Sequence, residues 1–364
     1  MEILAAVVRE NGGTTTLETL DLAEPGESEI LVRLVATGVC HTDLKARELS
    51  RYAPKPVVLG HEGAGIVERV GAAVRTAAPG DHVVMTFDSC AVCPSCVQNE
   101  PAYCYESRPR NFGCTRPDGS TTLSSAGAPI HGSFFGQSSF ATFALGTERN
   151  VVKIRQDAPL ELLGPLGCGI QTGAGAIINT LGVGQGHCVA IFGVGSVGQS
   201  AVMAARLMGA SRIIALDVLD HRLDRALALG ATDTVNTQRE LAHEAIERIV
   251  AHGVDVAFDT TGVAPLMRQA IQSLAPRGTF GFVAAPPDGE IPVDLSHLLA
   301  GGRRVRGVIQ GDSKPHAFIP ALVDFYMQGR FPIDKIVTYY PFDRIGEAFD
   351  DSSTGTTIKP ILRF

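Results

Sequence analysis

Four cysteines lie close together in one short stretch of the chain, with the spacing of a metal site. They are Cys90, Cys93, Cys96 and Cys104. Four thiols within fifteen residues are hard to explain by core packing, whereas a turn-rich segment can fold them around one tetrahedral ion. An all-cysteine tetrahedron is the closed, structural kind of zinc site. The sequence therefore predicts a structural zinc in a lobe at about residues 88–106.

Three further residues are candidates for a second metal site that stays open to a substrate. Cys40, His61 and Cys168 each lie in a glycine-containing turn after or near an apolar strand, where a side chain can face a cleft. Their spacing does not join them, and a single buried cysteine is usually a small hydrophobe. A lone histidine is likewise more often a core or surface residue than a ligand. On the residues alone, both interpretations stay open.

A glycine-rich turn follows a predicted buried strand and opens a predicted helix. Gly193, Gly195 and Gly198 would permit a tight turn, close approach of a pyrophosphate and close packing of the helix on the strand. Asp217 ends the next predicted strand, at about the spacing expected of a residue that accepts from ribose hydroxyls. An aspartate there repels a 2′-phosphate, so the pattern favours NAD over NADP. The alternative is an ordinary glycine-rich turn and a surface aspartate.

The elements that would position these residues change in character near residue 170. Before that point, short strands broken by Gly and Pro predict an irregular, mostly antiparallel β domain. These strands are 30–36, 65–70, 82–86 and 139–145. Beyond it, strands alternate with helices, which predicts a doubly wound parallel sheet. The strands are 187–192, 212–217, 254–259 and 279–284, and the helices are 196–208, 219–229 and 265–274.

The remaining segments and the composition exclude several classes of protein. A helix at 317–328 and short strands would return the chain to the first domain, and 111–131 is predicted as a long surface loop. The net charge of −7 gives no reason to expect nucleic acid or an anionic membrane as a partner. No apolar stretch approaches the roughly 20 residues of a membrane span or resembles a signal sequence. Eight cysteines without a signal predict reduced, metal-binding thiols in a cytoplasmic protein.

The segment Gly60–Val67 (GHEGAGIV) resembles the G-H-E-x-x-G-x-x-V signature of the zinc-containing medium-chain alcohol dehydrogenases, although the last Val of the signature falls on Glu68. The other motifs occur in that family's order over essentially the whole chain: Gly38–Asp43, the four cysteines, Gly167–Gly169 and the glycine-rich turn. Within the family, residues 40–43, 133–145 and 162–175 look most like aryl-alcohol (benzyl-alcohol) dehydrogenases. The resemblance implies a GroES-like catalytic domain (1–169), a Rossmann domain (170–312) and a C-terminal return to the catalytic domain (313–364).

By that resemblance, Cys40, His61 and Cys168 ligate a catalytic zinc whose fourth position takes water or a substrate oxygen. The zinc lowers the pKa of the alcohol, and hydride then passes to the nicotinamide. Asp43 would accept from the second ring nitrogen of His61. Glu62 would lie beside the metal, as a transient ligand or as a charge that tunes the field there; the alternative is a buried, hydrogen-bonded carboxylate.

Thr42 would hydrogen-bond the alcohol and take its proton. Many relatives continue this relay through a histidine at the position of Lys45, and lysine at its usual pKa of about 10.4 is a poor base. Either the pKa of Lys45 is lowered, or the proton leaves through water, or the lysine is a solvated charge with no role.

The resemblance also implies a set of contacts with NAD. His41 stands where many relatives carry an Arg against the pyrophosphate, so NAD affinity is expected to rise as pH falls through the His41 titration. The further residues implied at the cofactor are Thr172, Val197, Arg222, Val283 and Lys359. For Arg222 and Lys359, the alternative is a solvated surface cation.

The substrate and the assembly are the least specified properties. Phe87, Phe135, Phe140 and Ile309 would line the alcohol cleft, unless they are simple core residues. Such walls favour a planar apolar alcohol over a sugar polyol, and the resemblance to aryl-alcohol dehydrogenases implies a primary aromatic alcohol, oxidised reversibly to the aldehyde. The alternatives are an allylic terpene alcohol such as geraniol and a non-catalytic zinc- and NAD-binding protein. The resemblance also implies a homodimer or homotetramer, because in the family the last strand of the dinucleotide sheet, here 303–310, pairs with a second subunit and would otherwise leave an open edge.

Overall fold

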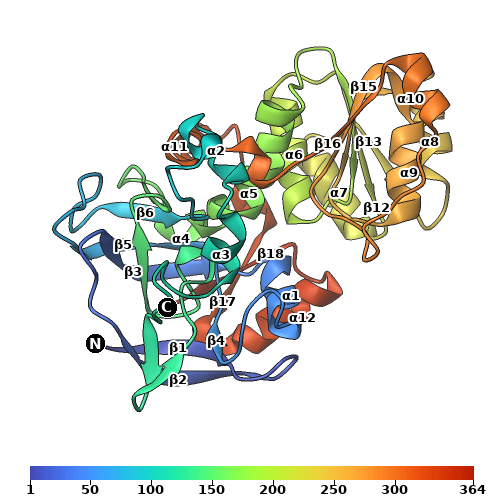
Figure 1. The fold of residues 1–364 in the computed structure, drawn as a ribbon. Helices are drawn as coiled ribbons and strands as arrows, with labels where there is room; N and C mark the ends of the chain where they lie inside the picture. The colour runs from blue at the N-terminus through green and yellow to red at the C-terminus, as the bar shows by residue number, and fades with distance from the viewer. The chain divides into compact units, whose positions relative to one another are not determined.

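The computed structural model describes residues 1–364, which divide into two compact units. The first unit comprises Met1–Cys168, Ser313–Gln328 and Ile333–Phe364, and the second comprises Gly169–Asp312 and Gly329–Pro332. Figure 1 shows that strands dominate the first unit, whereas helices flank a single sheet in the second. None of the helices is long and apolar enough to cross a membrane.

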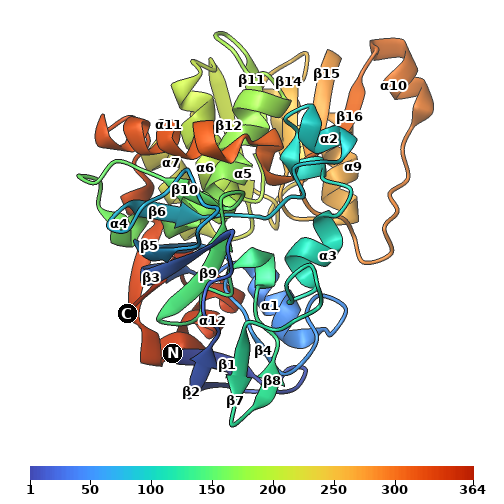
Figure 2. The ribbon, with the colours of Figure 1, turned by 60° about the vertical axis from the view of Figure 1, so that its left-hand side comes forward.

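Two sheets form the first unit. One has the strand order β4-β1-β2-β7-β8, and Figure 2 shows these strands together near the N-terminus. The other runs β10-β6-β5-β3-β18-β17, with β9 also paired to β3. All pairs are antiparallel except β17 with β18, which confirms the predicted β domain. The bounds are β1 Glu2–Val8, β2 Thr15–Leu22, β3 Glu29–Gly38, β4 Val57–Val58, β5 Gly63–Val70, β6 His82–Met85, β7 Leu123–Ser125, β8 Ala128–Ile130, β9 Phe143–Thr147, β10 Val151–Lys153, β17 Val337–Pro341 and β18 Lys359–Arg363.

The helices of the first unit are α1 His41–Glu48, α2 Pro94–Val97, α3 Ser107–Phe112, α4 Leu160–Leu163, α11 Pro315–Met327 and α12 Ile345–Thr354. Strand β3 organises the packing because its side chains alternate between two cores. Val32 and Leu34 face a small core with Val67, whereas Leu31 faces the larger core that contains Phe140. Its C-terminal end leads directly into Cys40 and α1, so a strand buried on both faces fixes the start of the first metal-ligand motif.

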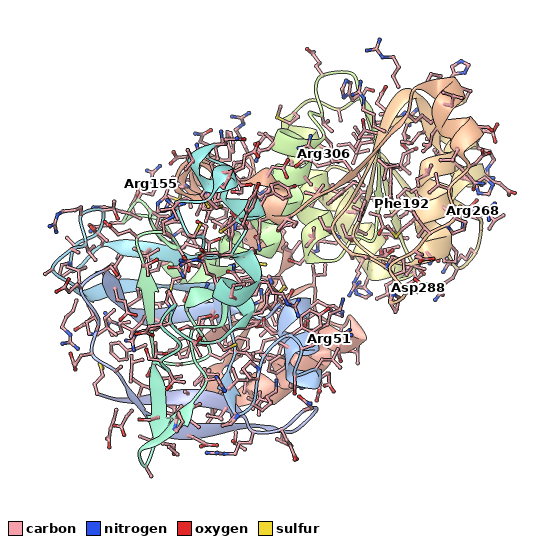
Figure 3. The ribbon with its side chains drawn as sticks, in the orientation of Figure 1. Arg51, Arg155, Phe192, Arg268, Asp288 and Arg306 are labelled. Carbon is pink, nitrogen blue, oxygen red and sulfur yellow. The ribbon has the colours of Figure 1, made fainter.

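The second unit is a parallel sheet with the order β13-β12-β11-β14-β15-β16, which confirms the predicted doubly wound fold. Its strands are β11 Cys188–Phe192, β12 Arg212–Asp217, β13 Asp233–Asn236, β14 Val254–Asp259, β15 Leu274–Phe282 and β16 Arg304–Gly307. Its helices are α5 Gly169–Gly175, α6 Ser196–Leu207, α7 Asp220–Leu229, α8 Ala242–Ile249, α9 Ala264–Gln272 and α10 Leu295–Gly301. Phe192 lies inside this sheet layer, whereas Arg268 projects outward from α9 (Figure 3).

Three predicted segments differ in the structure. The strand predicted at 279–284 begins earlier, because β15 spans Leu274–Phe282. Residues 111–131 are not all loop, because β7 and β8 form a hairpin there. The central turn residues Ala126 and Gly127 both have positive φ, the backbone that a two-residue hairpin turn requires. The predicted strand 139–145 begins only at Phe143, since the backbone N–H groups of Ser139 and Phe140 donate instead to Gly60 and Leu59.

Candidate active site

The four cysteines of the lobe converge, as their spacing predicts. The Sγ atoms of Cys90, Cys93, Cys96 and Cys104 all lie within 4.8 Å of one another. Cys90 and Cys96 are 3.9 Å apart at sulfur, and Cys93 and Cys104 are 4.0 Å apart. A zinc–sulfur bond of about 2.3 Å gives a tetrahedron whose edges are about 3.8 Å. The sulfur positions therefore fit a structural zinc.

Backbone N–H groups donate to sulfur atoms of this group and favour the thiolate at Cys93, whereas burial raises the pKa of the Cys104 thiol to about 12. Cys93 donates its N–H to the sulfur of Cys90, and Tyr105 donates to the sulfur of Cys93. The Tyr105 N–H lowers the pKa of the Cys93 thiol to about 6. Thiolates are the form that binds zinc. Cys114 is fully buried and is not part of this group.

A second group forms in the first unit from residues far apart in the sequence. Ligand atoms of Cys40, His61, Glu62 and Cys168 lie within 4.8 Å of one another. Cys40 is the N-cap of α1, His61 precedes β5, and Cys168 follows a short 3₁₀ turn. Gly38 and Gly164 permit the close packing here, because a Cβ on either would meet Glu62 at 2.0 to 2.2 Å. The fold thus brings together the motifs of Cys40, His61 and Cys168, although their spacing in the sequence does not link them.

Asp43 orients this group from the first turn of α1. Its carboxylate is fully buried and accepts from the Cys40 N–H at 2.9 Å, from the Gly60 N–H at 3.1 Å and from His61 Nδ1 at 2.9 Å. The contact expected between Asp43 and His61 is therefore present. His61 Nε2 is buried with no hydrogen-bond partner. A free ring nitrogen facing two cysteine sulfurs is the donor set of an open zinc site, so these residues fit the metal.

Glu62 and Lys359 form a buried ion pair next to this group. Lys359 Nζ lies 2.6 Å from Glu62 Oε2 and donates to the Val39 carbonyl at 3.0 Å. Burial raises the pKa of the Glu62 carboxyl to about 7, although Lys359 opposes the shift. Lys359 is only 1% exposed, so its interpretation as a solvated surface cation is wrong. Its proposed phosphate contact would have to compete with Glu62.

The remaining residues predicted on α1 lie in its first two turns. His41 and Thr42 are its first two residues, and Lys45 is exposed one turn later. Desolvation lowers the pKa of His41, and the charge of Lys45 lowers it further.

In the second unit, the glycine-rich turn has the geometry that the sequence predicts. Gly193 has φ +83°, and a Cβ on Gly198 would lie 2.0 Å from the Gly193 carbonyl. Gly195 is the N-cap of α6, with no side chain covering the helix end. This turn leaves backbone N–H groups for an anion. Asp217 accepts from the Val194 N–H at 2.8 Å, which places its carboxylate at the turn.

The other predicted cofactor residues occupy the same unit. Arg222 Nη1 lies 3.8 Å from Asp217, and its buried Nε has no partner. Val197 is in the first turn of α6, and Thr172 is on α5, where it contacts Gln310 at 3.4 Å. Val283 directly follows β15 and donates its N–H to the Asp259 carbonyl.

Of the residues predicted to line the alcohol cleft, two have clear positions in the first unit. Phe135 stacks on the imidazole of His61, with ring centroids 4.5 Å apart. Phe140 is 1% exposed and packs against Phe349, so it is a core residue. Phe87 is buried, and Ile309, in the second unit, is half exposed.

Sequence reasoning missed Gln137, which ties the backbone around His61. Its amide donates to the carbonyls of His61 and Thr86 and accepts from the Gly63 N–H. The resemblance of segment 133–145 points only to the stretch as a whole, and the role of Gln137 is not visible in it because its partners are 51 to 76 residues away.

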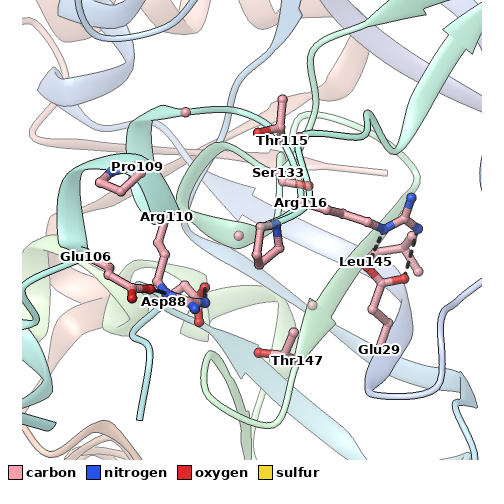
Figure 4. Close-up of a pocket in the computed structure, with 15 residues that line it drawn as sticks. Glu29, Asp88, Glu106, Pro109, Arg110, Thr115, Arg116, Ser133, Leu145 and Thr147 are labelled. Carbon is pink, nitrogen blue, oxygen red and sulfur yellow. Dashed lines mark hydrogen bonds and ion pairs between the residues drawn. The ribbon is translucent and has the colours of Figure 1, made fainter. Parts of the chain in front are cut away.

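A separate cavity of about 580 Å³ opens in the first unit between α3 and β9. Figure 4 shows Arg116 paired with Glu29 and Arg110 paired with Asp88 along its lining. None of the four residues of the second metal group lines it.

Comparison with known proteins places the chain in a family. Residues 26–156 match the alcohol dehydrogenase GroES-like domain, and residues 196–327 match the zinc-binding dehydrogenase domain. The chain is 46% identical over 363 residues to a geraniol dehydrogenase of Castellaniella defragrans, covering 99% of this chain and 97% of the relative.

Two solved structures are similar over the whole chain. A benzyl alcohol dehydrogenase from Acinetobacter calcoaceticus is 44% identical with a TM-score of 0.97, covering 100% of this chain and 99% of that one. An alcohol dehydrogenase zinc-binding domain protein from Burkholderia ambifaria is 50% identical with a TM-score of 0.98, at the same coverage. With the two converged metal groups and the parallel-sheet unit, these similarities show that the chain belongs to the zinc-containing medium-chain alcohol dehydrogenases.

Proposed function

We propose that the protein is an NAD- and zinc-dependent dehydrogenase of primary aromatic alcohols, working reversibly between alcohol and aldehyde. The observation that carries the proposal is the free Nε2 of His61 beside Cys40 and Cys168. The aromatic choice is supported by the rings of Phe134 and Phe135 against His61 and by similarity to a benzyl alcohol dehydrogenase.

Cys40, His61 and Cys168 would hold the catalytic zinc, and the four lobe cysteines a structural one. When bound, zinc supplies Lewis-acid polarisation of the substrate oxygen, and NAD supplies the hydride acceptor. Asp43 would accept the Nδ1 proton of His61, which would direct Nε2 to the metal when zinc is bound.

Thr42 is proposed to take the proton of the alcohol at its hydroxyl oxygen, from the first turn of α1. Because Lys45 is exposed on the same helix, water can accept the proton next without help from the lysine. The ion pair with Lys359 would keep Glu62 from acting as a base in these steps.

NAD is proposed over NADP because of the chemistry at the glycine-rich turn. The N–H groups at the start of α6 would bind the pyrophosphate. Asp217 would accept from the ribose hydroxyls and repel a 2′-phosphate. His41, Thr172, Val197, Arg222, Val283 and Lys359 remain proposed cofactor contacts.

Steady-state assays with benzyl alcohol and geraniol, each with NAD and NADP, test the substrate and the cofactor together. We expect the highest kcat/KM with benzyl alcohol and NAD. A much higher kcat/KM for geraniol would overturn the substrate assignment in favour of the allylic terpene alternative, which the 46% identity to a geraniol dehydrogenase supports. Preference for NADP would overturn the role of Asp217.

A homodimer or homotetramer is also proposed, since the sheet of the second unit ends on β16, all of whose residues are exposed. A monomer mass in sedimentation equilibrium would contradict it.

The eight unpaired cysteines support a reducing, cytoplasmic location, which cell fractionation tests.

A further inference from the structure

The turn at Ser133–Ser138 has an unusual backbone. Ser133, Phe135 and Ser138 have φ of +60°, +53° and +53°, and Gly136 has +67°. Residues with side chains rarely adopt the left-handed region, and such strain persists only where the surroundings enforce it. Strained residues cluster at functional sites, so this turn calls for a physical reason.

Buried hydrogen bonds hold the turn in place from both sides. Asn150 Nδ2 donates to the carbonyls of Phe135 and Gly136, at 3.2 and 3.0 Å. Ser138 accepts from the Phe134 N–H at 2.9 Å and donates to the Val58 carbonyl at 2.6 Å. The backbone is therefore anchored independently of the two phenylalanine side chains that it presents.

Those two side chains enclose the imidazole of His61. The Phe135 ring stacks on it at 4.5 Å with an interplanar angle of 25°, and the Phe134 ring meets it edge-on at 5.5 Å and 84°. Both geometries are the favoured ones for aromatic pairs. Asp43 fixes the ring through Nδ1, but a single hydrogen bond leaves the ring free to tilt about that contact. A ring stacked on its face removes the tilt.

We propose that Phe135 is a positioning residue for the metal ligand His61: the strained turn places its ring on the imidazole, so that Nε2 points at the sulfur pair before metal binds. Phe134 supports the arrangement from the edge. The inference rests on the proposed function of His61 as a zinc ligand. It adds to Asp43 a second, apolar element that fixes the same side chain.

The test compares Phe135→Leu, which removes the stacked ring, with Phe349→Leu as a matched control. Phe349 is a ring of the same core, 1% exposed, whose aromatic contact is Phe140 and not His61. Phe135→Tyr keeps a ring on the imidazole. Two readouts are measured on each zinc-loaded protein: release of zinc to a chromogenic chelator, and visible d–d bands after cobalt replaces the catalytic zinc.

In Phe135→Leu we expect one zinc equivalent to leave about 10-fold faster than in the wild type, the size typical for loss of a group that orients a ligand. Its cobalt bands shift, whereas Phe349→Leu and Phe135→Tyr keep the wild-type rate and bands. The second equivalent, at the four lobe cysteines, leaves at one rate in all variants.

Equal release from Phe135→Leu and Phe349→Leu, with unshifted bands, would overturn the inference and leave Phe135 a core residue only. If Phe135→Leu does not fold, zinc release and cobalt bands are measured on Phe134→Leu instead. We expect zinc release from this variant to be accelerated by a smaller factor, and an unchanged rate would count against the proposal. Failure of the proposed function would give a different result: the wild type would then release one zinc equivalent instead of two.

Discussion

The ion pair between Glu62 and Lys359 is fully buried beside the second metal group. The side chains are 0% and 2% exposed, so each charge depends on the other for compensation. Removing one partner of such a buried pair typically costs about 3 to 5 kcal/mol. We predict a loss of this size in the free energy of unfolding of Lys359→Met, measured by urea denaturation.

Lys153→Met is the control for that variant, because Lys153 pairs with Asp81 while 57% exposed. An exposed pair contributes about 1 kcal/mol or less. A loss in Lys359→Met no larger than in Lys153→Met would show that Glu62 does not depend on its partner.

Asp259 gives the second unit a pH-dependent stability. Burial raises the pKa of its carboxyl to about 6, although the N–H groups of Gly262 and Thr261 oppose the shift. In the unfolded chain the pKa is about 3.9. The protonated carboxyl therefore stabilises the fold fully below about pH 4, and this contribution, about 3 kcal/mol, is lost as pH rises through 6.

The neutral variant Asp259→Asn should not lose stability in this window. We predict that its urea midpoint gains on that of the wild type between pH 4.5 and 7, whereas protonation of the cysteine and histidine ligands affects both proteins alike. A difference between the two midpoints that stays constant with pH would refute the assignment.

At the scale of elements, the contact between strand β11 and helix α6 depends on a residue without a side chain. A Cβ on Gly198 would lie 2.0 Å from the Gly193 carbonyl, so Gly198→Ala must push the helix from the turn. We predict at least a 10-fold weaker NAD affinity by calorimetry. Gly184→Ala is the control, since nothing lies within 4 Å of its Cβ, and equal affinity in the two variants would contradict the prediction.

The sequence predicted the parallel sheet closely because apolar runs and glycines mark its elements locally. Strands β12 and β14 have the predicted bounds, 212–217 and 254–259. The prediction failed for strands whose bounds depend on backbone pairing with a distant segment of the chain. The hairpin of β7 and β8 has three-residue strands without clear alternation, and the start of β9 depends on backbone pairing with Leu59 and Gly60.

At the site, motif positions could be predicted, but the residues that hold them could not. His61, Cys40 and Cys168 stand in recognisable motifs. Gln137 and Phe135 lie in the segment 133–145 that resembles aryl-alcohol dehydrogenases, but their contacts with His61 could not be predicted, because more than seventy residues of chain separate the partners. The pair of Lys359 with Glu62 spans 297 residues, and only the last strand, β18, brings the lysine there.

At the scale of the whole molecule, one chain carries two metal groups of different design. The lobe group has four cysteines and is closed. The second group has two cysteines, a histidine and the carboxylate of Glu62, which forms an ion pair with Lys359. In the first, the residues saturate a tetrahedron. In the second, Cys40, His61 and Cys168 would leave a fourth position open on a bound zinc, which is the difference expected between a structural and a catalytic zinc.

Zinc content per subunit, measured with alcohol-dependent NADH formation, tests this account most directly. We predict two zinc ions in the wild type and one in Cys168→Ser, which forms no NADH. Cys96→Ser, the matched change in the lobe, should also hold one zinc but keep Cys40, His61 and Cys168 loaded. A wild type with a single zinc that survives in Cys168→Ser, or NADH formation at the wild-type rate in that variant, would contradict the account.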